Sequence, residues 1–122
     1  MRAVLRRRAA GDADATLAFD VYCHRMRKYI GAYHAVLGRI DAIVFTAGVG
    51  ENAAEVRAAS TAGLEMWGIT VDPDRNTSGA GARIISPETS PVVVCVVPTD
   101  EEHAIARHTL DLLDRQAPDS AP

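Results

Sequence analysis

The sequence predicts an α/β domain in which helices flank a mixed sheet. Helical and strand patterns alternate along the 122 residues, and the strand patterns are short apolar runs typical of buried parallel strands. The composition, with 48% hydrophobic and 24% charged residues, is that of a globular chain and excludes wholesale disorder. A chain of this length is expected to form one domain with a real core.

Two helices are expected in the first third of the chain. Residues 1–10 have the pattern of a short helix. A long helix is expected over 13–38, with Asp12 or Asp14 as its N-terminal cap and Gly38 at its end. Its apolar positions recur at steps of three to five and predict one buried face, which consists of Leu17, Val21, Met26, Ile30, Tyr33 and Leu37.

Four strands are expected in the rest of the chain, over 40–46, 69–71, 83–86 and 91–97. The last of them is the most apolar, and we expect it to be central in the sheet. A helix is predicted over 53–66, and the stretch 72–81, which contains glycines and a proline, is predicted to be a loop.

A final helix is expected over 100–116. Thr99 and Glu102 have the spacing of a capping box at its start. Residues 117–122 are expected to form a frayed tail, so the predicted domain covers residues 1–116.

Charge and composition argue against several classes of function. The net charge of −3 disfavours a general nucleic-acid binder, and Arg6–Arg8 is interpreted as a solvated helix face. No apolar run approaches the roughly 18 residues of a membrane span, and no secretory signal is recognised. Cys23 and Cys95 have neither CxxC spacing nor a disulfide pattern. We therefore expect a cytosolic protein without a nucleic-acid or membrane partner.

The stretch 43–52 is the most informative for function. A predicted strand runs into Gly48-Val49-Gly50, and Glu51-Asn52 is expected to open the following helix. Glycines at such a position let the backbone approach a ligand closely, and a helix N-terminus offers free N–H groups to an anion. A structural role, in which the glycines only turn the chain, is equally compatible with so short a motif.

Two functional interpretations of this motif compete. The first is a dinucleotide-binding unit, because Gly48-x-Gly50-x-x-Ala53 fits the fingerprint and Asp72 stands near the position of a ribose-binding acid. Against it, the carboxylate of Glu51 would repel a pyrophosphate. The second is the nucleotide-binding lobe of a phosphotransferase, in which this turn lies along the adenosine.

An ordered series of motifs resembles the C-terminal part of acetate kinases and favours the second interpretation. The segments concerned are FTAGVGEN at 45–52, EVR at 55–57, GLE at 63–65, VPTDEE at 97–102 and, upstream, YIGAY at 29–33. The resemblance extends over essentially residues 1–115.

The resemblance implies an actin-like ATPase/sugar-kinase (ribonuclease H-like) fold and the reaction of ATP with acetate to give acetyl phosphate and ADP. It implies that Glu101 is associated with Mg²⁺ or Mn²⁺ and that Arg2 contacts the nucleotide. It also implies a homodimer. The residues that would hold ATP or ADP are Gly48, Val49, Gly50, Glu51 and Asn52.

The chain departs from the family pattern in several respects. Asp100 replaces an asparagine, and from spacing alone Glu101 would be a helix-capping residue. None of the four histidines matches the catalytic one of the family, and His103 and His108 are expected at the surface. We therefore expect a C-terminal portion that is inactive alone, with acetate bound only by the complete enzyme.

Two alternatives remain open at this stage. The acid-selecting pocket is expected outside this chain, so a propionate or butyrate kinase would fit the same residues. The other alternative is a non-catalytic remnant that binds nucleotide or serves only as an interaction module.

Overall fold

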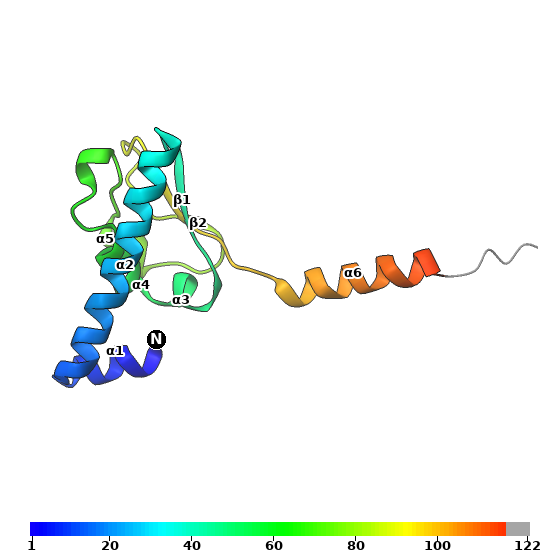
Figure 1. Cartoon of the computed structure of the whole chain (residues 1–122), viewed down its shortest axis with the longest axis horizontal. Helices are drawn as coiled ribbons and strands as arrows, with labels where there is room; N and C mark the ends of the chain where they lie inside the picture. The colour runs from blue at the N-terminus through cyan, green and yellow to red at the C-terminus, as the bar shows by residue number, and fades with distance from the viewer. Residues whose placement is uncertain (117–122) are drawn as a thin grey trace, which may run out of the picture.

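A computed structural model of the chain describes residues 1–116, and the expected tail at 117–122 lies outside the described residues. Figure 1 shows the elements along the chain. In chain order they are α1 (Arg2–Ala9), α2 (Ala13–Leu37), β1 (Ala42–Phe45), α3 (Ala47–Asn52), α4 (Ala54–Thr61), a 3₁₀ turn (Glu65–Trp67), α5 (Pro73–Thr77), β2 (Arg83–Ile84), β3 (Val93–Val96) and α6 (Glu101–Gln116).

The sheet is mixed, as expected, and its strand order is β1-β3-β2. β3 is central: it pairs in parallel with β1, placing Phe45 opposite Val96, and antiparallel with β2. The strand expected over 69–71 is reduced to a single bridge between Ile69 and Val92. The pairing stops there because Asp72 already caps α5, which starts at Pro73.

Helix α2 has the expected ends but a different buried face. A carboxylate oxygen of Asp12 accepts the Ala15 N–H at 3.0 Å, and Gly38 closes the helix with a φ of 71°. The fully buried positions are Ala15, Phe19 and Cys23. Four residues of the expected face are instead more than half exposed, namely Leu17, Val21, Tyr33 and Leu37. The other two, Met26 and Ile30, are partly buried and pack against the core, so the expected face was only partly right. Apolar residues occur around much of this helix, and the packing selects which of them are buried.

The pattern at 53–66 does not form one continuous helix. α4 ends at Thr61, Gly63 follows with a φ of 81°, and the 3₁₀ turn then ends at Gly68 with a φ of 77°. Gly63 in the left-handed region therefore breaks the predicted element, because glycine adopts that region without a Cβ penalty, whereas Gly68 lies beyond its predicted end.

Two short helices were not predicted from the sequence. α5 lies inside the expected loop 72–81, and Asp72 caps it by accepting the N–H groups of Asp74 and Arg75. Proline after a capping aspartate is a recognised start signal, so the sequence did contain the information. The other is α3, whose six residues coincide with the glycine motif.

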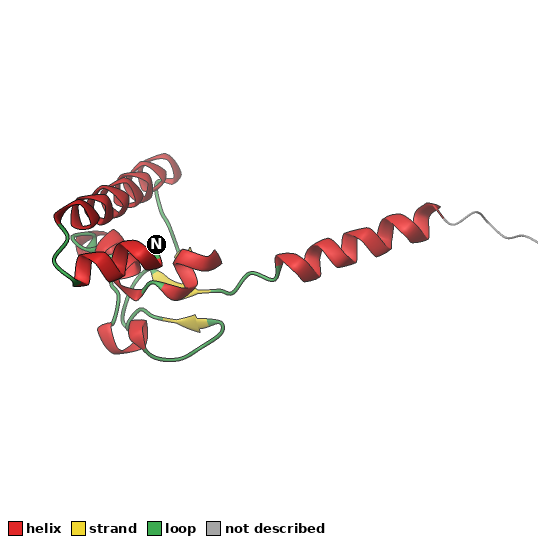
Figure 2. Ribbon diagram, turned by 90° about the horizontal axis from the view of Figure 1, so that it is seen from below, coloured by secondary structure: helices red, strands yellow, loops and turns green. Residues whose placement is uncertain are grey.

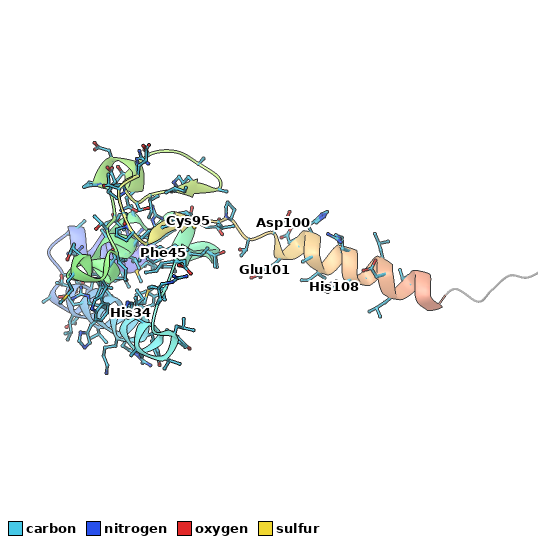
Figure 3. All side chains as sticks on the ribbon, turned by 90° about the horizontal axis from the view of Figure 1, so that it is seen from above. His34, Phe45, Cys95, Asp100, Glu101 and His108 are labelled. Atoms are coloured by element: carbon cyan, nitrogen blue, oxygen red, sulfur yellow. The ribbon has the colours of Figure 1, made fainter. Side chains whose placement is uncertain are left out.

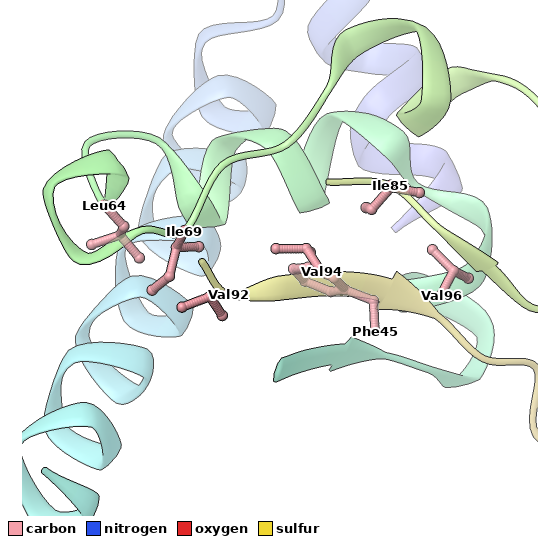
Figure 4. Close-up of a cluster of buried hydrophobic side chains, with 7 residues drawn as sticks. All are labelled: Phe45, Leu64, Ile69, Ile85, Val92, Val94 and Val96. Carbon is pink, nitrogen blue, oxygen red and sulfur yellow. The ribbon is translucent and has the colours of Figure 1, made fainter. Parts of the chain in front are cut away.

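The core consists of two clusters of buried side chains. Figure 4 shows the first, which surrounds the sheet and contains Phe45, Leu64, Ile69, Ile85, Val92, Val94 and Val96. The second lies where α2 meets α4 and contains Phe19, Cys23, Ala53 and Val56. Because Met1, at the start of the chain, and Val49 of α3 both pack against the second cluster, the chain start lies near the glycine motif.

Helix α6 leads away from the rest of the chain (Figures 1 and 2). Four of its large apolar side chains are more than half exposed, namely Ile105, Leu110, Leu112 and Leu113. The capping-box prediction for its start was wrong, because the Asp100 carboxylate, at 3.0 Å, accepts the His103 N–H. Among the residues described, no helix is both long enough and apolar enough to cross a bilayer.

Candidate functional site

A polar pocket lies beyond the carboxyl ends of the parallel strands β1 and β3. β1 leads directly into Ala47 and Gly48, and β3 leads through Pro98 to the start of α6. These two connections border an open pocket of about 430 Å³, lined by Ala47, Gly48, Thr99, Asp100, Glu101 and Glu102. Open α/β sheets bind ligands at this edge of parallel strands. Two of the predicted site residues, Gly48 and Glu101, therefore line one pocket although they are far apart in the sequence.

A carboxylate joins the two sides of this site. Glu51 Oε1 accepts the backbone N–H of Thr99 at 3.0 Å and the Thr99 hydroxyl at 3.3 Å. The Thr99 hydroxyl is therefore engaged away from α6, which explains why Asp100 caps that helix. The same bonds orient one oxygen of the Glu51 carboxylate toward Thr99.

The glycine motif adopts a helical turn rather than an open loop. The left-handed residue is Ala47, with a φ of 58°, and neither glycine of the motif has a positive φ. A non-glycine residue in this region is strained, and such strain occurs often at functional sites. The expectation that Glu51 and Asn52 open the following helix was wrong. They end α3 instead, and the Asn52 amide donates to the Gly48 carbonyl at 2.9 Å.

The two glycines serve different purposes. A Cβ on Gly48 would meet nothing within 4 Å, so its backbone is open toward the pocket. A Cβ on Gly50 would lie only 3.0 Å from the carbonyl carbon of Phe45. Gly48 is therefore free to face a ligand, whereas Gly50 is required by the close approach of α3 to β1.

Sequence reasoning did not single out Arg57, which is 2% exposed and bonded to the same motif. Its guanidinium donates to the carbonyls of Gly50 at 2.7 Å and Glu51 at 3.0 Å. It also donates to Asn76 Oδ1 at 2.7 Å and to the Asn76 carbonyl at 2.6 Å. Burial, and then the positive charge of Arg83, lower the pKa of Arg57, while Glu55 opposes them. The only sequence signal was its place in the EVR motif.

Glu101 is exposed at the start of α6 next to Asp100 (Figure 3). Within the described part of the chain, no group of three or more acidic, histidine or cysteine side chains could enclose a metal ion. Mg²⁺ is commonly held by one or two carboxylates together with substrate phosphates. The donor set of the described residues therefore fits a metal ion that arrives with a nucleotide, and does not fit a metal cage built by those residues alone.

The remaining predicted residues are placed separately. Arg2 is exposed on the first turn of α1 and does not line the 430 Å³ pocket. Asp72 does not act as a free ribose-binding acid, because its carboxylate caps α5. That observation argues against the dinucleotide interpretation. His103 and His108 are exposed on α6, as expected.

The chain is an α/β domain whose polar pocket lies at the carboxyl edge of parallel strands, the edge at which open α/β sheets bind ligands. Comparison with known proteins identifies the family within this structural class. Residues 1–107 match the Acetokinase family, and the chain belongs to that family.

Relatives and solved structures agree with this assignment. The acetate kinase of Streptomyces avermitilis is 60% identical over 114 residues, which are 93% of this chain and 28% of that protein. The crystal structure of Porphyromonas gingivalis acetate kinase superposes with a TM-score of 0.82 and 42% identity, covering 92% of this chain and 28% of that one. A propionate kinase from Francisella tularensis superposes with a TM-score of 0.77 and 34% identity, covering 87% and 27%.

The fold class is thereby confirmed as part of an α/β kinase lobe. The chain spans about 28% of the length of the curated relatives it matches.

Proposed function

We propose that this chain carries part of the nucleotide site of an acetate kinase, a phosphotransferase that converts ATP and acetate to ADP and acetyl phosphate. The supporting observation is the pocket that brings Gly48 together with Glu101 in a chain of this family. ADP or ATP is the proposed ligand, with Mg²⁺ or Mn²⁺ bound alongside.

Each residue of the proposed site has a separate task. Gly48 presents open backbone to the nucleotide, and Val49 and Gly50 pack α3 against the core behind it. Glu51 fixes the start of α6 through Thr99, and Asn52 ends α3 through the Gly48 carbonyl. Arg2 is proposed to reach the nucleotide from the first turn of α1.

The Glu101 carboxylate is proposed to hold the divalent cation that accompanies the nucleotide phosphates. When bound, the cation neutralises phosphate charge, which is the largest electrostatic requirement of phosphoryl transfer. The Glu101 side chain needs only to present one oxygen to the pocket, and its place at the pocket edge is compatible with this.

Catalysis is proposed for a complete enzyme and not for these 122 residues alone. Phosphoryl transfer depends on holding both substrates in line, and no acid-binding site has been identified in the described residues. Acetate, homodimerisation and a cytoplasmic location are therefore proposed for the complete enzyme. Propionate is the alternative acid, because a propionate kinase superposes on this chain nearly as well.

Calorimetric titration of the chain with ADP, with and without Mg²⁺, tests this proposal. We expect saturable ADP binding that Mg²⁺ strengthens, no comparable binding of NAD, and loss of the Mg²⁺ effect in Glu101→Gln. Asp111→Asn, a charge-matched change farther along α6, is the control. Absence of ADP binding by the folded chain, or equal binding of NAD, would contradict the proposal.

A further inference from the structure

Arg57 connects two short helices from inside the protein. Two of its hydrogen bonds reach the carboxyl end of α3, at Gly50 and Glu51, and two reach Asn76 on α5. We propose that Arg57 and Asn76 are positioning residues that hold α3 in the conformation that lines the pocket; their effect on ligand binding rests on the proposed nucleotide site.

Helix α3 needs such support because it cannot be stable alone. It has six residues, whereas isolated helices below about 12 residues are marginal in water. It also begins with the strained Ala47, which tertiary contacts must stabilise. The last carbonyls of a helix have no partners within the helix, and Arg57 supplies donors to two of them.

The chemistry of these bonds favours positioning over simple packing. A guanidinium presents a planar set of donors in fixed directions, so four acceptors at once define where α3 and α5 lie. The carbonyl end of a helix carries partial negative charge and favours a cation there. The described residues place no carboxylate on the Arg57 nitrogens, so the guanidinium depends on these carbonyl and amide oxygens.

Asn76 is itself held in one orientation. It is 3% exposed, and its Nδ2 donates to the Ala54 carbonyl at 2.9 Å, which turns Oδ1 toward Arg57. Asp72 caps the helix that carries it. Contacts therefore run from α5 through Arg57 to the carboxyl end of α3, the helix that contributes Gly48 to the pocket.

The test compares variants of this network with a matched arginine elsewhere. Arg57→Met removes all four hydrogen bonds, and Asn76→Ala removes the Oδ1 acceptor. Arg57→Lys keeps the positive charge but lacks the planar set of guanidinium donors. Arg27→Met is the control, because Arg27 also bonds a backbone carbonyl, that of Ala59, and among the described residues it forms no hydrogen bond with α3. Each variant is assayed for ADP affinity, amide exchange and melting temperature at a temperature where it is folded.

We expect Arg57→Met and Asn76→Ala to raise the Kd for ADP by about tenfold, against less than about twofold for Arg27→Met at similar thermal stability. Amide exchange should rise within 47–52 and stay unchanged in β3. Compared with Arg57→Met, Arg57→Lys should restore the melting temperature more fully than it restores ADP affinity. If Arg57→Met does not fold, the ADP affinity and amide exchange of Asn76→Ala and Arg57→Lys test the proposal.

The outcomes separate this proposal from the proposed function. If the parent chain does not bind ADP, the proposed nucleotide site fails, and the exchange experiment decides alone: a rise confined to 47–52 supports the positioning role. Uniformly raised exchange, or ADP affinity that follows melting temperature equally in the Arg57 and Arg27 variants, would overturn it.

Discussion

Glu51 and Thr99, 48 positions apart in the sequence, are joined by two hydrogen bonds to one carboxylate oxygen. The contact ties the end of α3 to the connection that precedes α6. It therefore links the two segments that contribute Gly48 and Glu101 to the polar pocket.

Glu51→Ala should loosen this link. We expect the Thr99 amide to exchange roughly threefold to tenfold faster, as for loss of one exposed hydrogen bond, and Mg²⁺-dependent ADP binding to weaken. Amide exchange measured by NMR checks the first effect. Glu55→Ala, on the exposed side of α4, is the control, and unchanged exchange at Thr99 in Glu51→Ala would show that the contact does not persist in solution.

Gly48 and Gly50 should respond differently to the same substitution. Gly48→Val has open space and should leave the melting temperature nearly unchanged while weakening ADP binding. Gly50→Val would push a side chain against the Phe45 backbone and should cost about 1–3 kcal/mol of stability. Thermal melts and ADP titrations of both variants distinguish the roles, and equal loss of stability would contradict them.

Val94 tests the central position of β3. It is fully buried, so Val94→Asp would place an unpaired carboxylate in the core at a cost of several kcal/mol and should abolish soluble expression. Val93→Asp is the matched control, because Val93 on the same strand is 37% exposed. Comparable solubility of the two variants would be incompatible with this packing.

The N-cap of α2 predicts a pH dependence. The Ala15 N–H, and then the Arg7 side chain, lower the pKa of Asp12 below its ordinary value of 3.8. A carboxyl whose pKa is lowered by folding stabilises the protein above its unfolded pKa, and that stability is lost as pH falls through the folded pKa. Asp12→Ala should therefore lower the melting temperature at pH 7, and the difference from the parent should shrink below pH 3.8.

Asp14→Ala is the control for this comparison, since Asp14 lies in the same helical turn without the capping bond. Melting curves from pH 7 to 2.5 provide the measurement. A difference between Asp12→Ala and the parent that is independent of pH would show that the Asp12 charge contributes nothing to the cap.

The two cysteines should differ in reactivity. Both are free thiols, but Cys23 is 3% exposed, and burial raises its pKa, whereas Cys95 is partly exposed. Because the thiolate is the reactive form, maleimide should label Cys95 first and Cys23 only on unfolding. Mass spectrometry with and without urea, using Cys23→Ala as a control, measures this. Equal rates in the folded chain would contradict the burial of Cys23.

Local sequence determined much of the architecture. The apolar run at 91–97 identified the central strand, although only alternate side chains of β3, those of Val94 and Val96, are fully buried. Asp12 and Gly38 marked the ends of α2, because capping depends on residues adjacent in the chain. The motif at 45–52, with those around it, also indicated the family.

Other features were decided by tertiary structure. Packing selected Ala15, Phe19 and Cys23 as the buried stripe of α2 from several apolar candidates. The fold made Gly50 necessary by bringing α3 against Phe45, and it placed positive φ at Ala47 where the glycines had been expected to matter. It also brought Glu51 to Thr99 and Arg57 to Asn76, pairs whose partners are far apart in sequence. Such contacts are invisible to local patterns, because their energy depends on distances that exist only after the chain has folded.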